Sequence, residues 1–345
     1  MEIKLEQLVK FYEKALVNKP NNPQIYSQLS ELYYAQGNLA GAIETYQKAV
    51  QIQPDLEASN NTIQRLLLAQ NQTQNNDTKL YNWITTDIES VACYPNAIKN
   101  ICIGKIDGIL IKQVFSLKEI ERVKEKILTL KNRTKTTLSW ELIGESLTNI
   151  KGEIKHYYEQ SFLFNLQLKK IFENNFEPRV LSVFNAISKL QTLELARQNS
   201  EKAFIPAQIR ILYPNSGGYK AHTEHELFEF YHLYEHLKPV VQQFDILSYF
   251  LVIDKPEVGG ELILYDFLSE HTTPVMKQIF YTNKLDEYLE KFRKQIIDPN
   301  IGDMVIFNGG RIWHKVADFD GEKQRISLGG LLVCCQENQK IFCLT

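Results

Sequence analysis

Six short apolar segments separated by turn residues fill the chain from residue 206 onward. Glycine, proline, asparagine and aspartate stand between these segments, which read AQIRILY, FDILSYFLVI, GGELILYDF, GDMVIFN, RIWHKVADF and QRISLGGLLVCC. Short strands with such turns between them are typical of a β-sandwich or barrel. A long interruption at about 268–300 carries KLDEYLEKFRKQI, which predicts a charged amphipathic helix between two strands. This insertion is either a lid over an active site or a solvated decoration.

The first seventy residues repeat with a period of 34. Three residues return at that offset: Tyr12, Ala15 and Pro20 as Tyr46, Ala49 and Pro54. Apolar positions at helical spacing on both sides of Gly37 predict two paired helices, and small residues at 42 and 49 allow a close approach. The pattern resembles the tetratricopeptide repeat, with one full unit at 23–56, a single helix before it and another at about 57–70.

The role of so short an array has two interpretations. It is either a packing or dimerising appendage or a peptide-binding surface, and a concave binding groove usually needs more stacked units. The segment AQNQTQNNDTK, which follows it, is rich in Asn and Gln and has no apolar periodicity, so it indicates a linker. We expect a helical repeat domain at 1–70, a linker at 71–79 and a second domain at 80–345, whose β core lies mainly at 206–345.

The composition is that of an ordinary soluble protein and narrows the set of partners. A formal net charge of −2 predicts no general attraction to nucleic acid or to an anionic membrane. The chain has no run of 18 uncharged apolar residues, and its start lacks the apolar core of a signal peptide. Five cysteines show neither CxxC spacing nor disulfide-rich density. We therefore expect reduced thiols, a cytoplasmic location, and no nucleic-acid or membrane partner.

A candidate metal site begins at His222 and Glu224 in the stretch YKAHTEHELF. On a strand, side chains two positions apart share one face, so both can reach a single ion. His314 in GGRIWHKV is the best candidate for a third ligand, and Arg325 and Ser327 follow on one face of the next predicted strand. Two imidazoles and one carboxylate leave positions open on an octahedral ion, as in non-haem Fe(II) oxygenases. A buried arginine with a nearby hydroxyl suits a dicarboxylate cosubstrate.

Each of these residues also has a simpler interpretation. A polar strand exposes such pairs at the surface, His314 could be a satisfied core histidine, and Arg325 could form an ordinary ion pair. Rival ligands exist as well, since a slip of one residue would offer His225 and Glu226 in place of His222 and Glu224. A further pair at helical spacing, His232 and His236, lacks the glutamate of a zinc-protease motif, and exposure on a helix explains it better.

The order of HxE, a distal His and RxS within consecutive β segments resembles the 2-oxoglutarate/Fe(II)-dependent dioxygenase superfamily. The resemblance covers roughly residues 100–345. It implies an α+β fold, in which a double-stranded β-helix (jelly-roll) core with flanking helices follows the small all-α repeat domain. It also implies Fe(II), 2-oxoglutarate and dioxygen as cofactors. Iron would be held by His222, Glu224 and His314, and the distal carboxylate of 2-oxoglutarate by Arg325 with help from Ser327.

Three phrases bring the chain closest to the carrier-independent halogenases of cyanobacterial indole alkaloids: PAQIRILY, DILSYFLVIDKPEVGGELILYDF and IGDMVIFNGGRIWHKV. In those enzymes a serine in the strand that corresponds to DILSYF lies in the outer shell of the metal, and Ser248 matches it. A bond from this hydroxyl to a neighbouring backbone is the alternative. Those halogenases have glycine in place of the carboxylate ligand, which leaves room for chloride. Glu224 fills that position here, and this departure from the halogenases predicts hydroxylation in place of halogenation.

The expected activity is hydroxylation of an unactivated C–H bond in a small molecule, either a natural-product intermediate or an amino-acid derivative. Phe228 and Tyr231, just beyond the ligands, either line the substrate pocket or pack against the barrel. The alternatives are hydroxylation of a peptide or protein captured by the repeats, and desaturation or cyclisation at the same site. Halogenation and a purely non-catalytic interaction role are disfavoured. The repeats could also mediate self-association.

Overall fold

The computed structural model describes most of the 345 residues. The residues outside the description are 1–4, 37, 54–79, 131–133, 136–139, 148–153, 189–191, 198, 200–201, 216–217, 231–236, 238–243, 273–284 and 336–339. Two compact units divide the chain: Met1–Leu80 with Glu270–Arg293, and Tyr81–Ser269 with Lys294–Thr345. None of the helices in the described ranges has the length and apolarity that crossing a membrane requires.

Three helices form the described N-terminal part of the first unit: α1 (Leu5–Asn18), α2 (Pro23–Ala35) and α3 (Leu39–Ile52). The side chain of Asn38 caps α3 by accepting a hydrogen bond from the amide of Gly41, at 3.0 Å. Ala42 and Ala49 are fully buried, as the repeat pattern predicts for a close helix pair. The hydroxyl of Ser30 donates to the carbonyl of Ala42 at 2.6 Å and so joins α2 to α3. The helix expected at 57–70 lies outside the described residues.

The second unit is built on one large and one small sheet. The order of the large sheet is β1-β2-β12-β8-β15-β6-β4-β3, and β16 joins β15 to β5. Its strands are β1 (Trp83–Asp87), β2 (Gly108–Lys112), β3 (Thr134–Lys135), β4 (Trp140–Ile143), β5 (Thr192–Leu195), β6 (Gln208–Leu212), β8 (Phe244–Asp254), β12 (Met304–Phe307), β15 (Arg325–Cys335) and β16 (Lys340–Leu344). The small sheet has the order β11-β10-β13-β7. Its strands are β7 (Tyr219–His222), β10 (Leu262–Leu268), β11 (Lys294–Ile297) and β13 (Ile312–Val316). A two-stranded ribbon pairs β14 (Phe319–Asp320) with β9 (Val258–Gly259).

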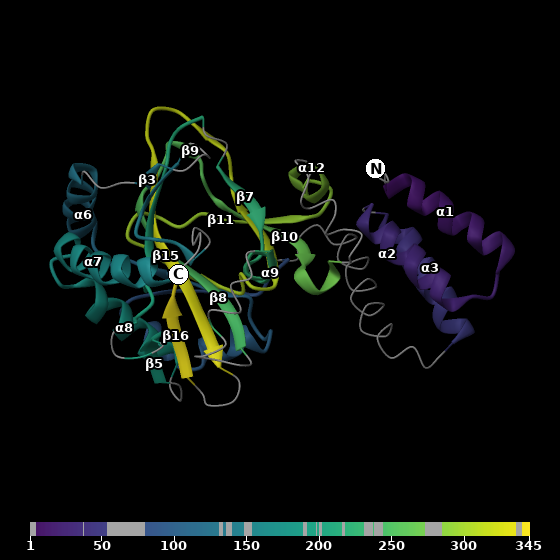
Figure 1. The fold of residues 1–345 in the computed structure, drawn as a ribbon, viewed down its shortest axis with the longest axis horizontal. Helices are drawn as coiled ribbons and strands as arrows, with labels where there is room; N and C mark the ends of the chain where they lie inside the picture. Colours follow the sequence, from purple (N-terminus) through teal and green to yellow (C-terminus); the bar gives the residue numbers. More distant parts are fainter. Residues whose placement is uncertain are drawn as a thin grey trace. The chain divides into compact units, whose positions relative to one another are not determined.

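Helices cover one face of the large sheet. They are α5 (Ala97–Cys102), α6 (Leu117–Thr129), α7 (Lys155–Ile171) and α8 (Phe176–Ile187), with the short η1 (Val91–Cys93). Figure 1 shows α6, α7 and α8 gathered on the side of the large sheet away from β7 and β10. Buried side chains of these helices and of the sheet form one continuous apolar cluster, which is the core of the unit. The expected α+β class with a jelly-roll core and flanking helices is confirmed.

Side chains alternate between the core and the interior of the barrel along the two strands that matter most for function. On β6, Ile209 and Ile211 are fully buried in the core, and the alternate residues Gln208, Arg210 and Leu212 line a cavity on the other side. On β15, Ile326 and Leu328 enter the core in the same way. The period of two therefore sends one face of each strand into the cavity.

The segment that interrupts the β pattern differs from its prediction. Only Leu285–Leu289 (α12) of the predicted helix KLDEYLEKFRKQI is helical, and its last residues belong to β11. The whole of β11 pairs antiparallel with β10. Pairing with the edge of β10 provides hydrogen-bond partners for the backbone N–H and C=O groups of β11. This long-range contact overrides the local helical pattern of its sequence.

A capping box at Ser116 begins α6. The Ser116 hydroxyl accepts from the amide of Glu119, and the Glu119 carboxylate accepts from the amide of Ser116 at 2.8 Å. Loss of a cap of this kind costs about 1 kcal/mol of stability. Ser116→Ala should therefore lower the thermal midpoint by about 2–4 °C in a calorimetric scan. Lys118→Ala, an exposed position in the same first turn, is the control and should leave the midpoint unchanged.

Candidate metal centre and active site

Antiparallel pairing of β7 with β13 brings the two candidate histidines together. His314 lies directly opposite His222 in the register of these strands. Residues opposite each other in such a pair project from the same face of the sheet. The two imidazole rings accordingly have centroids 4.3 Å apart.

Glu224 reaches the histidines from a helix and not from a strand. The strand β7 ends at His222, and Glu224 is the first residue of α9 (Glu224–Phe230). Thr223 begins this helix, because its hydroxyl accepts from the amide of Glu226 at 3.2 Å and its carbonyl from the amide of Leu227. The expectation that His222 and Glu224 share one strand face is therefore wrong, although the turn into the helix still places the carboxylate beside His222.

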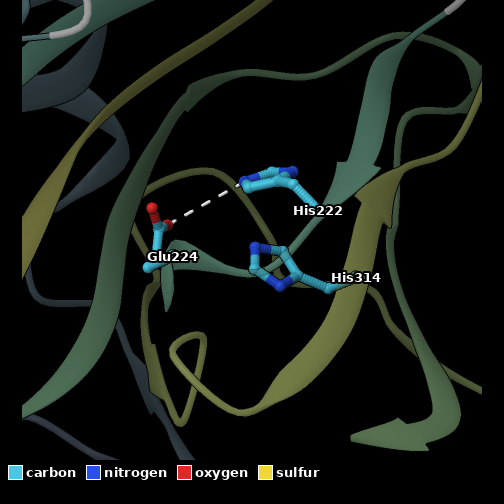
Figure 2. A group of neighbouring side chains, drawn as sticks. All are labelled: His222, Glu224 and His314. Carbon is cyan, nitrogen blue, oxygen red and sulfur yellow. Dashed lines mark ion pairs between the residues drawn. The ribbon is translucent and has the colours of Figure 1, made fainter. Parts of the chain in front are cut away.

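The three side chains converge on one point. One ligand atom from each of His222, Glu224 and His314 lies within 4.8 Å of the others. The Nε2 of His222 is 3.9 Å from Oε1 of Glu224. Figure 2 shows the rings and the carboxylate turned toward one another, and these side chains come from β7, α9 and β13. This is the donor set that divalent iron prefers, with two imidazoles and one carboxylate, so these residues could hold such an ion.

Both histidines are held in the tautomer that a metal needs. The Nδ1 of His222 lies 2.8 Å from the carbonyl of Lys220, and the Nδ1 of His314 lies 2.9 Å from the carbonyl of Ile312. A carbonyl only accepts, so each Nδ1 carries the hydrogen and each Nε2 keeps a lone pair. Burial lowers the pKa of His222 to about 4 and that of His314 to about 3. Both rings are therefore neutral at pH 7.

Ser248 contacts the carboxylate of Glu224. Its hydroxyl donates to Oε1 of Glu224 at 2.9 Å. The turn between β12 and β13 adds a second contact, since the amide of Glu224 donates to the carbonyl of Gly309 at 3.0 Å. Gly309 packs so closely here that a β-carbon on it would lie 1.8 Å from the Ser248 hydroxyl oxygen. The position of Glu224 is therefore fixed at both its backbone and its side chain.

Arg325 and Ser327 lie together on β15, as their spacing predicts. Arg325 is buried, its Nε donates to the carbonyl of Gly260 at 2.9 Å, and its Nη1 donates to the hydroxyl of Ser327 at 3.0 Å. No carboxylate of the described residues pairs with it. Burial, and to a smaller extent the charge of Arg210, lowers the pKa of Arg325 to about 10. An unpaired, buried guanidinium of this kind is suited to a carboxylate ligand.

One cavity of about 300 Å³ contains all of these groups. It is lined by the three candidate ligands, Ser248, Arg325 and Ser327, and by apolar side chains that include Phe228. Tyr231, His232 and His236 lie outside the described residues. His225 and Glu226 are not among the described residues that line this cavity. The lining also includes Arg210, which the sequence interpretation missed, although a charged residue at the centre of the apolar strand QIRIL was a visible signal.

Comparison with protein families gives two matches. Residues 80–345 match the model of the carrier-protein-independent halogenase WelO5, and residues 31–61 match a TPR repeat. The second match confirms the repeat resemblance of the N-terminal helices. Comparison with curated proteins gives no match.

Comparison with solved structures gives matches that include the following three. An N-substituted L-amino acid dioxygenase from Burkholderia ambifaria AMMD has 16% sequence identity and a TM-score of 0.51, covering 73% of this chain and 91% of that one. Its complex with alpha-ketoglutarate has 14% identity and a TM-score of 0.47, covering 71% and 90%. HygX from Streptomyces hygroscopicus, with nickel and 2-oxoglutarate bound, has 9% identity and a TM-score of 0.40, covering 68% and 85%. The first of these shows that the fold is shared.

The family match spans most of the chain, including every described residue that lines the cavity. The donor set and the unpaired Arg325 fit the iron and 2-oxoglutarate that this type of enzyme uses together with dioxygen. The chain therefore belongs to the family of the carrier-protein-independent halogenase WelO5, within the 2-oxoglutarate/Fe(II)-dependent oxygenases.

Proposed function

We propose that this enzyme hydroxylates an unactivated C–H bond of a small molecule, with iron held by His222, Glu224 and His314. The observation that carries the proposal is the Glu224 carboxylate, which lies among the two imidazoles and accepts from Ser248 at 2.9 Å. When bound, iron and 2-oxoglutarate supply the oxidising chemistry, in which dioxygen is the oxidant. The protein supplies the ligands, their orientation and a site that excludes water.

The two histidines act as neutral donors. Their Nδ1–H groups are fixed by backbone carbonyls, so their Nε2 lone pairs point into the site without any rearrangement. Ser248 is a positioning residue, because it occupies one lone pair of Glu224 and restricts rotation of the carboxylate. We retain Ser248 in this outer-shell role and Phe228 as part of the substrate pocket, where it is buried on the cavity wall.

Arg325 is proposed to bind the distal carboxylate of 2-oxoglutarate, with the Ser327 hydroxyl beside it. The Nε and one Nη of Arg325 are already engaged with Gly260 and Ser327, which fixes the plane of the guanidinium. Its remaining N–H groups have no acidic partner in the described residues and can donate to the incoming carboxylate. The positive charge stays in place because even the lowered pKa of Arg325, about 10, lies well above neutrality.

Glu224 favours hydroxylation over halogenation. In the halogenases that the sequence resembles, glycine at this position leaves room for chloride on the metal. Here the Glu224 carboxylate already supplies an anionic donor. Its negative charge would repel a chloride ion at that place, and its volume would exclude the ion. Halogenation remains the second candidate function, favoured by the family match itself.

The cavity supports a small substrate. At about 300 Å³ it lies at the lower end of the range for small-molecule sites, and apolar groups make up much of its wall. We propose a natural-product intermediate or an amino-acid derivative. Desaturation and cyclisation would use the same residues, so product analysis decides among them.

The remaining expectations stand as part of the proposal. They are a division into repeats at 1–70, a linker at 71–79 and an oxygenase domain at 80–345, and a cytoplasmic location. All five cysteines are free, as a reducing compartment would keep them. The match to a TPR repeat supports a protein partner or self-association for the N-terminal helices.

The reaction class is tested by oxygen-dependent succinate formation with Fe(II) and 2-oxoglutarate, together with an untargeted mass-spectrometric search for products that gain one oxygen atom. Glu224→Ala should abolish both signals, because the metal loses its anionic ligand. Glu229→Ala, an exposed glutamate on α9, is the matched control and should retain them. Efficient chlorination by the unchanged protein would contradict the role given to Glu224.

Removal of the Ser248 hydroxyl should weaken metal binding. Loss of an outer-shell partner typically lowers metal affinity about 10-fold or more. Ser248→Ala should therefore raise the dissociation constant for Co(II) by about this factor in an anaerobic titration. Ser188→Ala is the control, since Ser188 is also buried and its hydroxyl has no hydrogen-bond partner. Equal Co(II) affinities in the two variants would contradict a role for Ser248 in positioning the metal ligand Glu224.

Truncation of Arg325 should affect the cosubstrate and spare the metal. Loss of one partner from a buried charge pair costs about 2–5 kcal/mol of binding free energy. Arg325→Gln should raise the dissociation constant of 2-oxoglutarate by at least about 30-fold, measured anaerobically on the Fe(II)-loaded protein. The Co(II) affinity of the same variant should stay close to that of the unchanged protein. An unchanged affinity for 2-oxoglutarate would show that the cosubstrate is anchored elsewhere.

A further inference from the structure

Arg210 projects into the cavity from the middle of β6. Its neighbours Ile209 and Ile211 are fully buried in the core on the opposite face of the strand. In the register of β6 with β15, Arg210 lies directly opposite Ser327. Arg210 therefore shares a face with Ser327 and with Arg325, and all three line the cavity.

The guanidinium of Arg210 lies near both Arg325 and the metal centre. Its central carbon lies 4.9 Å from the centroid of the Tyr219 ring, in a cation–π contact. The ring of Tyr219 lies in turn 5.1 Å from the ring of His222. On the other side, the charge of Arg210 acts on Arg325 and contributes to lowering its pKa.

Arg210 has no anionic partner within the described part of the chain. Its Nε is buried and makes no hydrogen bond, and Tyr219 is its one aromatic contact. Arg210 as a whole is half-buried, but its buried Nε lacks the hydrogen bond that a desolvated donor needs, and the charge of Arg325 nearby adds repulsion. The contact with Tyr219 offsets part of this cost, and no acidic group of the described residues offsets the rest, which points to a ligand.

The charges in the cavity show what kind of ligand this is. Two arginines and a divalent iron outweigh the single negative charge of Glu224, and the two carboxylates of 2-oxoglutarate still leave one positive charge. One further carboxylate would neutralise the site. Arg325 is fixed by Gly260 and Ser327, whereas Arg210 is stacked on the ring next to His222, where a substrate must lie to react.

We propose that Arg210 is a second carboxylate anchor, which binds the carboxylate of the primary substrate and makes this oxygenase select organic acids. The inference rests on the proposed function, in which Arg325 takes the distal carboxylate of 2-oxoglutarate. The planar fork of Arg210, held by Tyr219, can donate two parallel hydrogen bonds to such a group. The other source of a carboxylate at this place is the metal-side end of 2-oxoglutarate itself.

The test measures two ligands on zinc-loaded protein, in which the reaction cannot proceed. Calorimetry gives the dissociation constant of 2-oxoglutarate for the unchanged chain, Arg210→Gln, Arg325→Gln and the exposed control Lys112→Gln. Saturation-transfer NMR then compares benzoate with its neutral isostere benzamide, in the presence of saturating 2-oxoglutarate. We expect Arg210→Gln to weaken benzoate about 10-fold or more and to leave benzamide and 2-oxoglutarate unchanged. Arg210→Lys should fall between, because it keeps the charge and loses the fork.

Other outcomes are equally informative. A loss of 2-oxoglutarate affinity in Arg210→Gln as large as that in Arg325→Gln, with benzoate unaffected, would assign the anchor to the cosubstrate and overturn selection of an acidic substrate. If Arg210→Gln changed the affinity for neither benzoate nor 2-oxoglutarate, the proposal that Arg210 binds a carboxylate would be wrong. Failure of the unchanged chain to bind 2-oxoglutarate would instead contradict the proposed function.

Thermal unfolding of the ligand-free protein separates a binding role from a structural one. A structural arginine stabilises the fold, so its loss lowers the midpoint. For an arginine whose partner is a ligand, Arg210→Gln removes a half-buried charge that pairs with no acidic group of the described residues. We expect the midpoint of this variant to equal or exceed that of the unchanged chain, and a clear decrease would contradict the proposal.

Discussion

The antiparallel pairing of β7 with β13 is the contact on which the metal centre depends. It sets His222 opposite His314, and each ring is then fixed by the carbonyl two residues before it. The large sheet contributes the rest of the cavity wall, with Ser248 on β8 and Arg325 on β15. The cavity therefore lies between two sheets, and the helices cover the other face of the large one, so its inner-face side chains are left available for ligands.

Much of this arrangement could be predicted from the sequence because it follows from strand periodicity. Arg325 and Ser327 are two positions apart, and alternation alone places them on one face. The identification of His314 required more, since many contacts between strands are distant in sequence. It depended on the order of HxE, distal His and RxS, which is why a family resemblance succeeded where composition could not.

The errors share one physical cause, which is that long-range or capping contacts overrode the local pattern. Thr223 starts a helix with its hydroxyl, so Glu224 is not on the strand where its spacing placed it. The residues Lys294–Ile297 have a helical pattern, and an available strand edge made them β11. Arg210 was overlooked because an isolated charge in an apolar strand acquires meaning only once its opposite neighbour, Ser327, is known.

The position of Glu224 on α9 has a consequence for how such enzymes diverge. The imidazoles belong to the sheet, and any change in their spacing would disturb strand pairing. The carboxylate belongs to the first turn of a short helix, outside the ladder of backbone hydrogen bonds. On the proposed role of Glu224, a single exchange at this residue would alter which anion the metal accepts and leave the pairing of β7 with β13 intact.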